Sequence, residues 1–181
     1  MDELFWSRIS QLAILMQPYC RALDKLQADK ARLPDIALSF GYFIKFWEQN
    51  TDCFLAEGMI SRLEKRWKSW EQPLLLLSLI LHSEYRLSKF NPDLESINFV
   101  TMRNWLEYYY KAWSYNKPTK LLAEFESYRV KKSPFNDETY EQFGDDILAY
   151  WYYCSTMCKE LGLVATKIFS IYINSASVER Q

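Results

Sequence analysis

Apolar side chains recur every three or four residues along almost the whole chain, which is the spacing of one face of an α-helix. The 181 residues include only 4 glycines and 6 prolines, too few for a β-sandwich, which needs a turn about every ten residues. Apolar residues make up 49% of the chain and aromatic residues 17%, so the chain can bury a core. The sequence therefore predicts a single all-α domain of about eight helices.

Prolines and polar breaks divide this pattern into segments. We expect helices over residues 4–26, 34–50, 52–70, 74–81, 96–116, 119–133, 137–162 and 163–171. Pro18 predicts a kink or a break near Gln17, because proline removes a backbone donor and clashes with the preceding turn. Ser96 is predicted to cap the fifth helix and Asn136 or Asp137 the seventh, and Gly162 is predicted to loosen the end of that seventh helix.

Charge and apolar run length limit the partners of the chain. The net charge is −1, so no overall field attracts nucleic acid or an anionic membrane. The longest apolar run, Leu74 to Leu81, is much shorter than the roughly 20 residues that cross a bilayer. The chain also has no glycine-rich phosphate loop or nucleophile elbow. We therefore expect neither a membrane partner nor a small-molecule substrate.

Candidate metal and acid–base groups are sparse. Cys154 and Cys158 are four residues apart on a predicted helix and share a face, but two ligands do not make a zinc site. His82 is the single histidine and is interpreted as a residue at a helix C-terminus. Asp145 and Asp146 are interpreted as first-turn charges, because no predicted strand presents a carboxylate for two-metal chemistry. We expect free thiols and no metal or cofactor.

Basic and aromatic residues alternate between Arg62 and Trp70, a pattern that can neutralise phosphates and stack bases. The same pattern describes a solvated helix face over an aromatic core, and both interpretations stay open. The residues that would contact nucleic acid are Arg62, Lys65, Arg66 and Lys68.

The string Asn174-Ser175-Ala176-Ser177-Val178-Glu179-Arg180, preceded by Glu160-Leu161-Gly162, resembles the C-terminal block of the hAT (hobo/Activator/Tam3) transposases. Arg66-Trp67, Pro73-Leu74-Leu75 and the run Ile80 to Arg86 resemble the helical insertion domain of fungal members, although Ser83 stands where the family commonly has proline. The resemblance implies an insertion-type domain over 1–135 and the start of the dimerisation block over 136–181. It also implies a nuclear location for this fragment of an RNase-H-like transposase.

By the same resemblance, Glu179 matches the last catalytic acid of the family, which uses a divalent metal such as Mg²⁺. The two aspartate partners of that acid would precede Met1, so we do not expect the chain to be an enzyme by itself. The resemblance also implies dimerisation, with a second copy or an intact transposase as partner. An alternative is that the chain supplies Glu179 and DNA contacts to DNA transposition.

An apolar C-terminal segment supports the association hypothesis physically, because two copies can cover such a surface through a C2 interface. Its residues can equally form the core within one chain. The predicted dimerisation residues are Trp151, Leu161, Leu163, Val164, Ala165, Ile168, Phe169 and Ile171.

Overall fold

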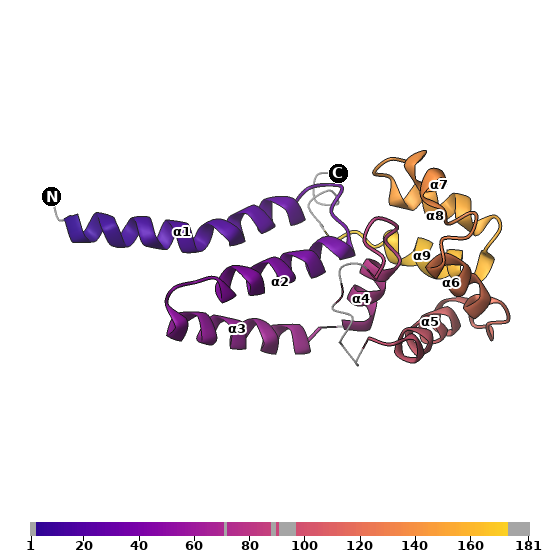
Figure 1. Ribbon diagram of the computed structural model, residues 1–181, viewed down its shortest axis with the longest axis horizontal. Helices are drawn as coiled ribbons and strands as arrows, with labels where there is room; N and C mark the ends of the chain where they lie inside the picture. The colour runs from indigo at the N-terminus through magenta and orange to yellow at the C-terminus, as the bar shows by residue number, and fades with distance from the viewer. Residues whose placement is uncertain (1–2, 71, 88–89, 91–96, 174–181) are drawn as a thin grey trace. The chain divides into compact units, whose positions relative to one another are not determined.

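The computed structural model describes residues 3–70, 72–87, 90 and 97–173, and every regular element in these residues is an α-helix (Figure 1). The all-α prediction is confirmed. The nine helices in this part of the chain are α1 (Glu3–Leu26), α2 (Leu33–Glu48), α3 (Cys53–Lys68), α4 (Gln72–Ile80), α5 (Phe99–Ser114), α6 (Leu121–Arg129), α7 (Asp137–Glu141), α8 (Ile147–Ser155) and α9 (Lys159–Phe169).

The chain divides into two compact units. The first consists of Met1–Trp70 with Tyr172–Gln181, and the second of Glu71–Ile171. The family resemblance implies a boundary after residue 135, whereas the two compact units meet at Trp70 and at Ile171. The boundary at 135 concerns segments of the transposase family and stays a prediction.

Helices α1, α2 and α3 form the first unit, with α2 in contact with both others. The connections are short, as expected for neighbouring antiparallel helices. Pro34 lies in the first turn of α2, as predicted. Asp52 caps α3, because its carboxylate accepts the Leu55 N–H at 3.0 Å.

Of the kink or break predicted near Gln17, the break does not occur, because α1 continues through Pro18 without interruption. Pro18 is buried, and the following residue anchors this half of the helix to α2. The Tyr19 ring stacks on Phe43 with centroids 4.5 Å apart, and the Tyr19 hydroxyl accepts the indole N–H of Trp47 at 2.6 Å. Packing against α2 thus offsets the cost of a proline inside the helix.

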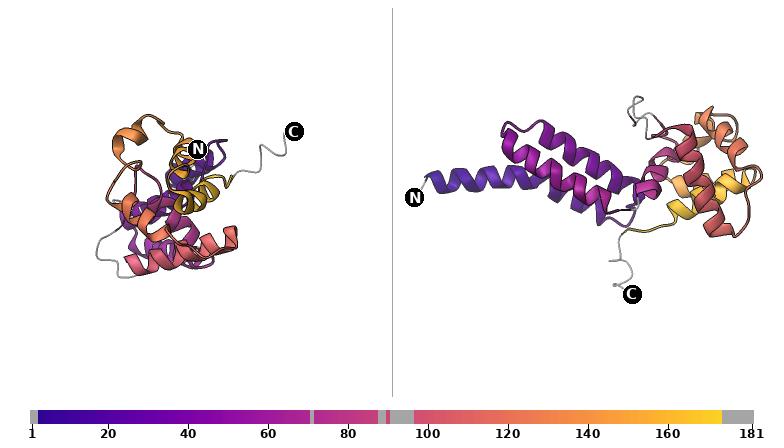
Figure 2. Two further views of the ribbon diagram at one scale, coloured as in Figure 1. Left: turned by 90° about the vertical axis from the view of Figure 1, so that its right-hand side faces the viewer. Right: turned by 90° about the horizontal axis from the view of Figure 1, so that it is seen from below.

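Helix α9 is the central element of the second unit and contacts α4, α5, α6 and α8. Leu77 and Leu81 are fully buried, so the apolar segment over 74–81 contributes to the core of this unit. The chain from α8 to α9 is seen in orange and yellow in Figure 2.

Two helix limits in this unit differ from the prediction. The expected helix over 137–162 is divided into α7, α8 and the first turn of α9. Asp146 starts a new helix because its carboxylate accepts the Ala149 N–H at 2.9 Å. Asn98 caps α5 by accepting the Thr101 N–H at 2.9 Å, whereas Ser96 lies outside the described residues.

Two other expectations concern single residues. Cys154 and Cys158 do not lie on one helix, since α8 ends at Ser155 and Cys158 is the N-cap of α9. Gly162 lies within α9 rather than at a helix end. Among the helices described, none has both the length and the apolar character needed to cross a membrane.

Candidate association surface

The structure places the predicted dimerisation residues mainly in the interior of the second unit. Leu163 and Ile171 are partly exposed. The other six side chains are 0% exposed: Trp151, Leu161, Val164, Ala165, Ile168 and Phe169. For these six residues, the structure therefore shows the alternative: they form the core within one chain. They offer no surface to a partner while the unit keeps this packing.

Close helix packing explains why α9 is so deeply buried. A Cβ atom added to Gly162 would lie 2.6 Å from both Cα and Cβ of Ser155 in α8. Only glycine allows the two backbones to approach this closely. Trp151 of α8 also donates its indole N–H to the Leu81 carbonyl at 3.0 Å, which ties α8 to the end of α4.

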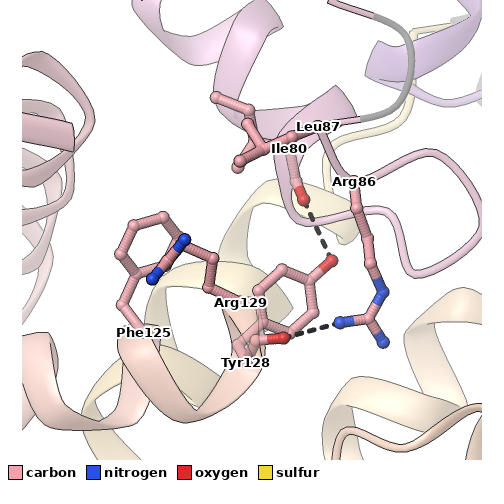
Figure 3. Close-up of a pocket in the computed structure, with 6 residues that line it drawn as sticks. All are labelled: Ile80, Arg86, Leu87, Phe125, Tyr128 and Arg129. Atoms are coloured by element: carbon pink, nitrogen blue, oxygen red, sulfur yellow. Dashed lines mark hydrogen bonds between the residues drawn. The ribbon is translucent and has the colours of Figure 1, made fainter. Parts of the chain in front are cut away.

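Hydrogen bonds around Arg86 join the end of α4 to α6 (Figure 3). The Tyr128 hydroxyl donates to the Ile80 carbonyl at 2.9 Å. The guanidinium of Arg86 donates to the carbonyls of Tyr128 and Phe135, both at 2.6 Å. Burial raises the pKa of Tyr128 well above its ordinary value. The cluster satisfies buried carbonyls and presents no reactive group.

Neither hollow beside this cluster resembles a ligand site. The cavity in Figure 3, lined by Ile80, Leu87 and Phe125 among others, has a volume of ≈ 60 Å³, far below the roughly 300–1,000 Å³ of ligand pockets. A larger hollow of ≈ 480 Å³ lies beside Phe99 and Met102. It is open to solvent, and its polar lining residues, Glu126 and Arg129, already pair with each other at 2.8 Å.

Potential metal ligands do not gather in the described part of the chain, where no three His, Cys, Asp or Glu side chains form a suitable group. His82 follows the end of α4 and its ring stacks on Tyr85, with centroids 4.2 Å apart. Burial raises the pKa of the Cys154 thiol to about 12, which disfavours the thiolate that metals bind. Glu179 lies outside the described residues.

The four basic residues predicted to contact nucleic acid, Arg62, Lys65, Arg66 and Lys68, all lie on α3 and are exposed. At 100° per residue they cover a continuous arc of about 160°. Glu57 and Glu64 lie beside this arc rather than within it. The structure therefore brings the four together on one solvent-facing side of the helix.

Among the described helices, α1 has the most large apolar side chains that are exposed. Figures 1 and 2 show that the N-terminal part of α1 continues past the ends of α2 and α3. We call its outward row of five apolar residues the α1 stripe. The row and the exposed fractions are Phe5 (53%), Ile9 (44%), Leu12 (56%), Met16 (49%) and Leu23 (55%).

The α1 stripe is distinct from the side of α1 that packs on α2. Pro18 and Ala22 are the buried residues of the helix, and they lie about 80° to 160° around the axis from Leu12, Met16 and Leu23. Trp6, which is 52% exposed, borders the stripe. Folding of the first unit therefore leaves a row of large apolar side chains in solvent.

The sequence predicted a helix over residues 4–26 but did not single out the α1 stripe. One available signal is the regular alternation of four- and three-residue steps from Phe5 to Leu26. Comparison of the chain with protein-family models, curated proteins and solved structures gives no match in any of the three.

Proposed function

We propose that the chain is a protein-association module whose contact surface is the α1 stripe. The observation that carries this proposal is the exposure of five large apolar side chains in one row on a helix that is otherwise well formed. Contiguous apolar surface of this kind often marks a site of protein–protein interaction. A partner that covers the row removes it from solvent, which favours association.

The area of the surface is sufficient for a specific contact. Each stripe residue and the bordering Trp6 are about half exposed, which leaves roughly 100 Å² of accessible area each for side chains of this size. The six together offer about 600 Å² on this side of the interface. That is the lower end of specific protein–protein interfaces, which bury about 1,200–2,000 Å² in total.

The family resemblance supplies a biological setting for this proposal. A helical segment of a hAT-type transposase would act in the nucleus, where its partner would be a second copy or an intact transposase. The closing sequence Ser175 to Arg180 supports this setting. The proposed role is non-catalytic. The sequence placed the association residues mainly on α9, which is interior, whereas the proposed contact lies on α1.

A photo-crosslinking experiment tests the proposal in cells that express the full chain. A benzophenone amino acid replaces Leu12 in one variant and Ser10 in a control, since both positions are exposed on the same helix but face different sides. We expect adducts of higher mass from position 12 and few from position 10. Equal or absent adducts at the two positions would overturn the proposal.

A second candidate function is a contribution to DNA transposition within a longer or partner transposase. The exposed arc of Arg62, Lys65, Arg66 and Lys68 on α3 favours it, because clustered cations release counterions from DNA. Replacing the four by Gln should weaken binding to duplex DNA at low salt and flatten its salt dependence. Absence of binding by the native chain at low salt would exclude the DNA contact.

The catalytic part of this candidate concerns Glu179. If the chain supplies this acid to a partner that lacks it, Glu179→Ala abolishes the rescued DNA cleavage while Glu179→Asp retains part of it. Unchanged cleavage by the alanine variant would exclude that role.

A further inference from the structure

We infer that the partner on the α1 stripe is a second copy of this chain, whose own α1 lies antiparallel to the first in a two-stranded coiled coil. This inference rests on the proposed association function and names its partner and geometry. It follows from the spacing of the stripe, the residues that border it and the side of α1 that α2 covers.

The spacing of the stripe indicates a helical partner. Seven apolar residues follow one another in alternating steps of four and three: Phe5, Ile9, Leu12, Met16, Tyr19, Leu23 and Leu26. Five of them form the exposed α1 stripe, whereas Tyr19 packs on α2 and Leu26 is partly buried. This is the a and d pattern of a heptad repeat, sustained for about three heptads. A heptad repeat of this kind can pack against another helix by knobs-into-holes packing.

The residues that border the seam favour an identical partner. The e positions hold Trp6, Ala13 and Cys20, and the g positions hold Arg8, Leu15 and Ala22. Coiled coils that select a different chain commonly do so with charges at e and g. Here Arg8 is the single charge among the six, and the whole stretch from Ile9 to Cys20 has none. Nothing at these positions repels a second copy.

The antiparallel orientation follows first from space. The α2 helix covers the C-terminal half of α1, where Pro18 and Ala22 are buried, whereas every described residue up to Ile14 is exposed. In a parallel pair, both copies of α2 and α3 would crowd around the same end of the seam. In an antiparallel pair they lie at opposite ends, and each exposed N-terminal half extends along the partner's α1.

The antiparallel register also matches charge. It sets Phe5 against Leu23 and Leu12 against Met16, and it brings Ile9 beside Tyr19, whose ring already stacks on Phe43 of α2. The acidic first turn of one α1, at Glu3, then lies near the basic last turn of the other, at Lys25. Opposed helix dipoles add to this arrangement. The pair is isologous, so both copies use the same residues.

The first measurement is the molar mass of the purified full chain by light scattering over a hundredfold concentration range. We expect a concentration-dependent shift from 21.7 kDa toward twice that mass. Ile9→Glu with Leu12→Glu should abolish the shift, because it places charge in the seam. The matched control, Ser10→Glu with Gln17→Glu, adds the same charge to exposed positions on another side of α1 and should keep the dimer. Circular dichroism must show equal helix content in all three.

The second measurement determines orientation by disulfide crosslinking. In a background that carries Cys20→Ser and Cys53→Ser, one chain receives Phe5→Cys and a second, with a tag of different size, receives Leu23→Cys. After mixing and oxidation with a copper catalyst, an antiparallel seam gives mainly the mixed disulfide between positions 5 and 23. A parallel seam gives disulfides between two tags of the same size.

The outcomes separate the inference from the proposed function. If most disulfides join two chains with the same tag, the antiparallel arrangement is wrong, although the chain still forms a dimer. A monomer at every concentration, with a Leu12 photo-adduct to a different protein, would overturn the second copy as partner and leave the association function intact. A monomer without any specific Leu12 adduct would overturn both.

Discussion

The carboxylate of Glu160 in α9 accepts a hydrogen bond from the backbone N–H of Leu121, the first residue of α6, at 2.6 Å. In return, the carboxylate of Glu124 in α6 accepts the backbone N–H of Leu161 in α9 at 2.7 Å. Each helix thus carries the acid that satisfies the other's unpaired N-terminal donors. The two helices depend on each other for their first turns.

Glu160 is the better placed of the two acids for a stability measurement. Its carboxylate also accepts the N–H groups of Thr119 at 2.9 Å and Lys120 at 2.8 Å. Burial opposes its ionisation, but these hydrogen bonds outweigh burial and lower the pKa of Glu160 below 4.5. We expect Glu160→Gln to lower the free energy of unfolding at pH 7 by about 1 kcal/mol, a value that allows for solvent screening.

The lowered pKa also sets the sign of the pH dependence. The stabilisation by ionised Glu160 is fully present above its unfolded pKa, near 4.5, and is lost as the pH falls through the lower folded value. Urea unfolding between pH 7 and pH 3 should therefore show a smaller loss of stability in Glu160→Gln than in the native chain. Parallel pH curves would contradict this.

Glu107→Gln is the control for Glu160→Gln. It removes only exposed ion pairs on α5 and should change stability by less than about 0.5 kcal/mol.

The start of α6 could be predicted from the sequence, but its cap could not. Apolar spacing and Pro118 indicated a helix from Thr119 or Lys120, and the structure begins it at Leu121. The acid that caps it, Glu160, is about 40 residues further along the chain. No local pattern points to a partner at that distance, because it depends on how α6 and α9 pack.

The candidate site shows the same limit more sharply. Leu12 of α1 and Phe169 of α9 both belong to apolar helical patterns, yet Leu12 is 56% exposed and Phe169 is 0% exposed. Periodicity identifies which side of a helix is apolar. It does not say whether another part of the same chain covers that side, which depends on contacts between distant segments. The sequence therefore predicted an apolar association surface but assigned it to the helix that became the core.

Substitution of Gly162 should test the close packing of α8 and α9. The added Cβ of Gly162→Ala would lie 2.6 Å from backbone and side-chain carbon of Ser155, so α8 and α9 must separate. We expect a loss of about 1–3 kcal/mol in the free energy of unfolding, measured by urea denaturation. Gly58→Ala in α3 is the control, since its Cβ meets nothing within 4 Å. It should stabilise by roughly 0.5–1 kcal/mol through helix propensity, and equal effects at the two glycines would contradict the close approach.

Replacement of Arg86 should show how much its two hydrogen bonds to backbone carbonyls stabilise the second unit. Arg86→Lys keeps the charge but cannot hold the carbonyls of Tyr128 and Phe135 together with the fixed geometry of a guanidinium. We expect a loss of about 1–3 kcal/mol in chemical denaturation. Arg103→Lys, at a half-exposed ion pair with Glu107, should cost less than about 0.5 kcal/mol. If the two lysine variants unfold alike, the Arg86 contact contributes little.

Thiol labelling provides a test that links burial to association. Cys20 and Cys53 are exposed and should react fastest with an aromatic disulfide reagent at pH 8. Cys154 is buried and its pKa is raised by burial to about 12, so it should react only when the second unit unfolds.

Because Cys20 borders the α1 stripe and Cys53 does not, a second copy on the stripe should slow the labelling of Cys20 relative to that of Cys53 as protein concentration rises. Peptide mass spectrometry of partly labelled samples measures this ratio, and the ratio should become independent of concentration in Ile9→Glu with Leu12→Glu. A concentration-independent ratio in the native chain would show that the flank of the stripe stays uncovered.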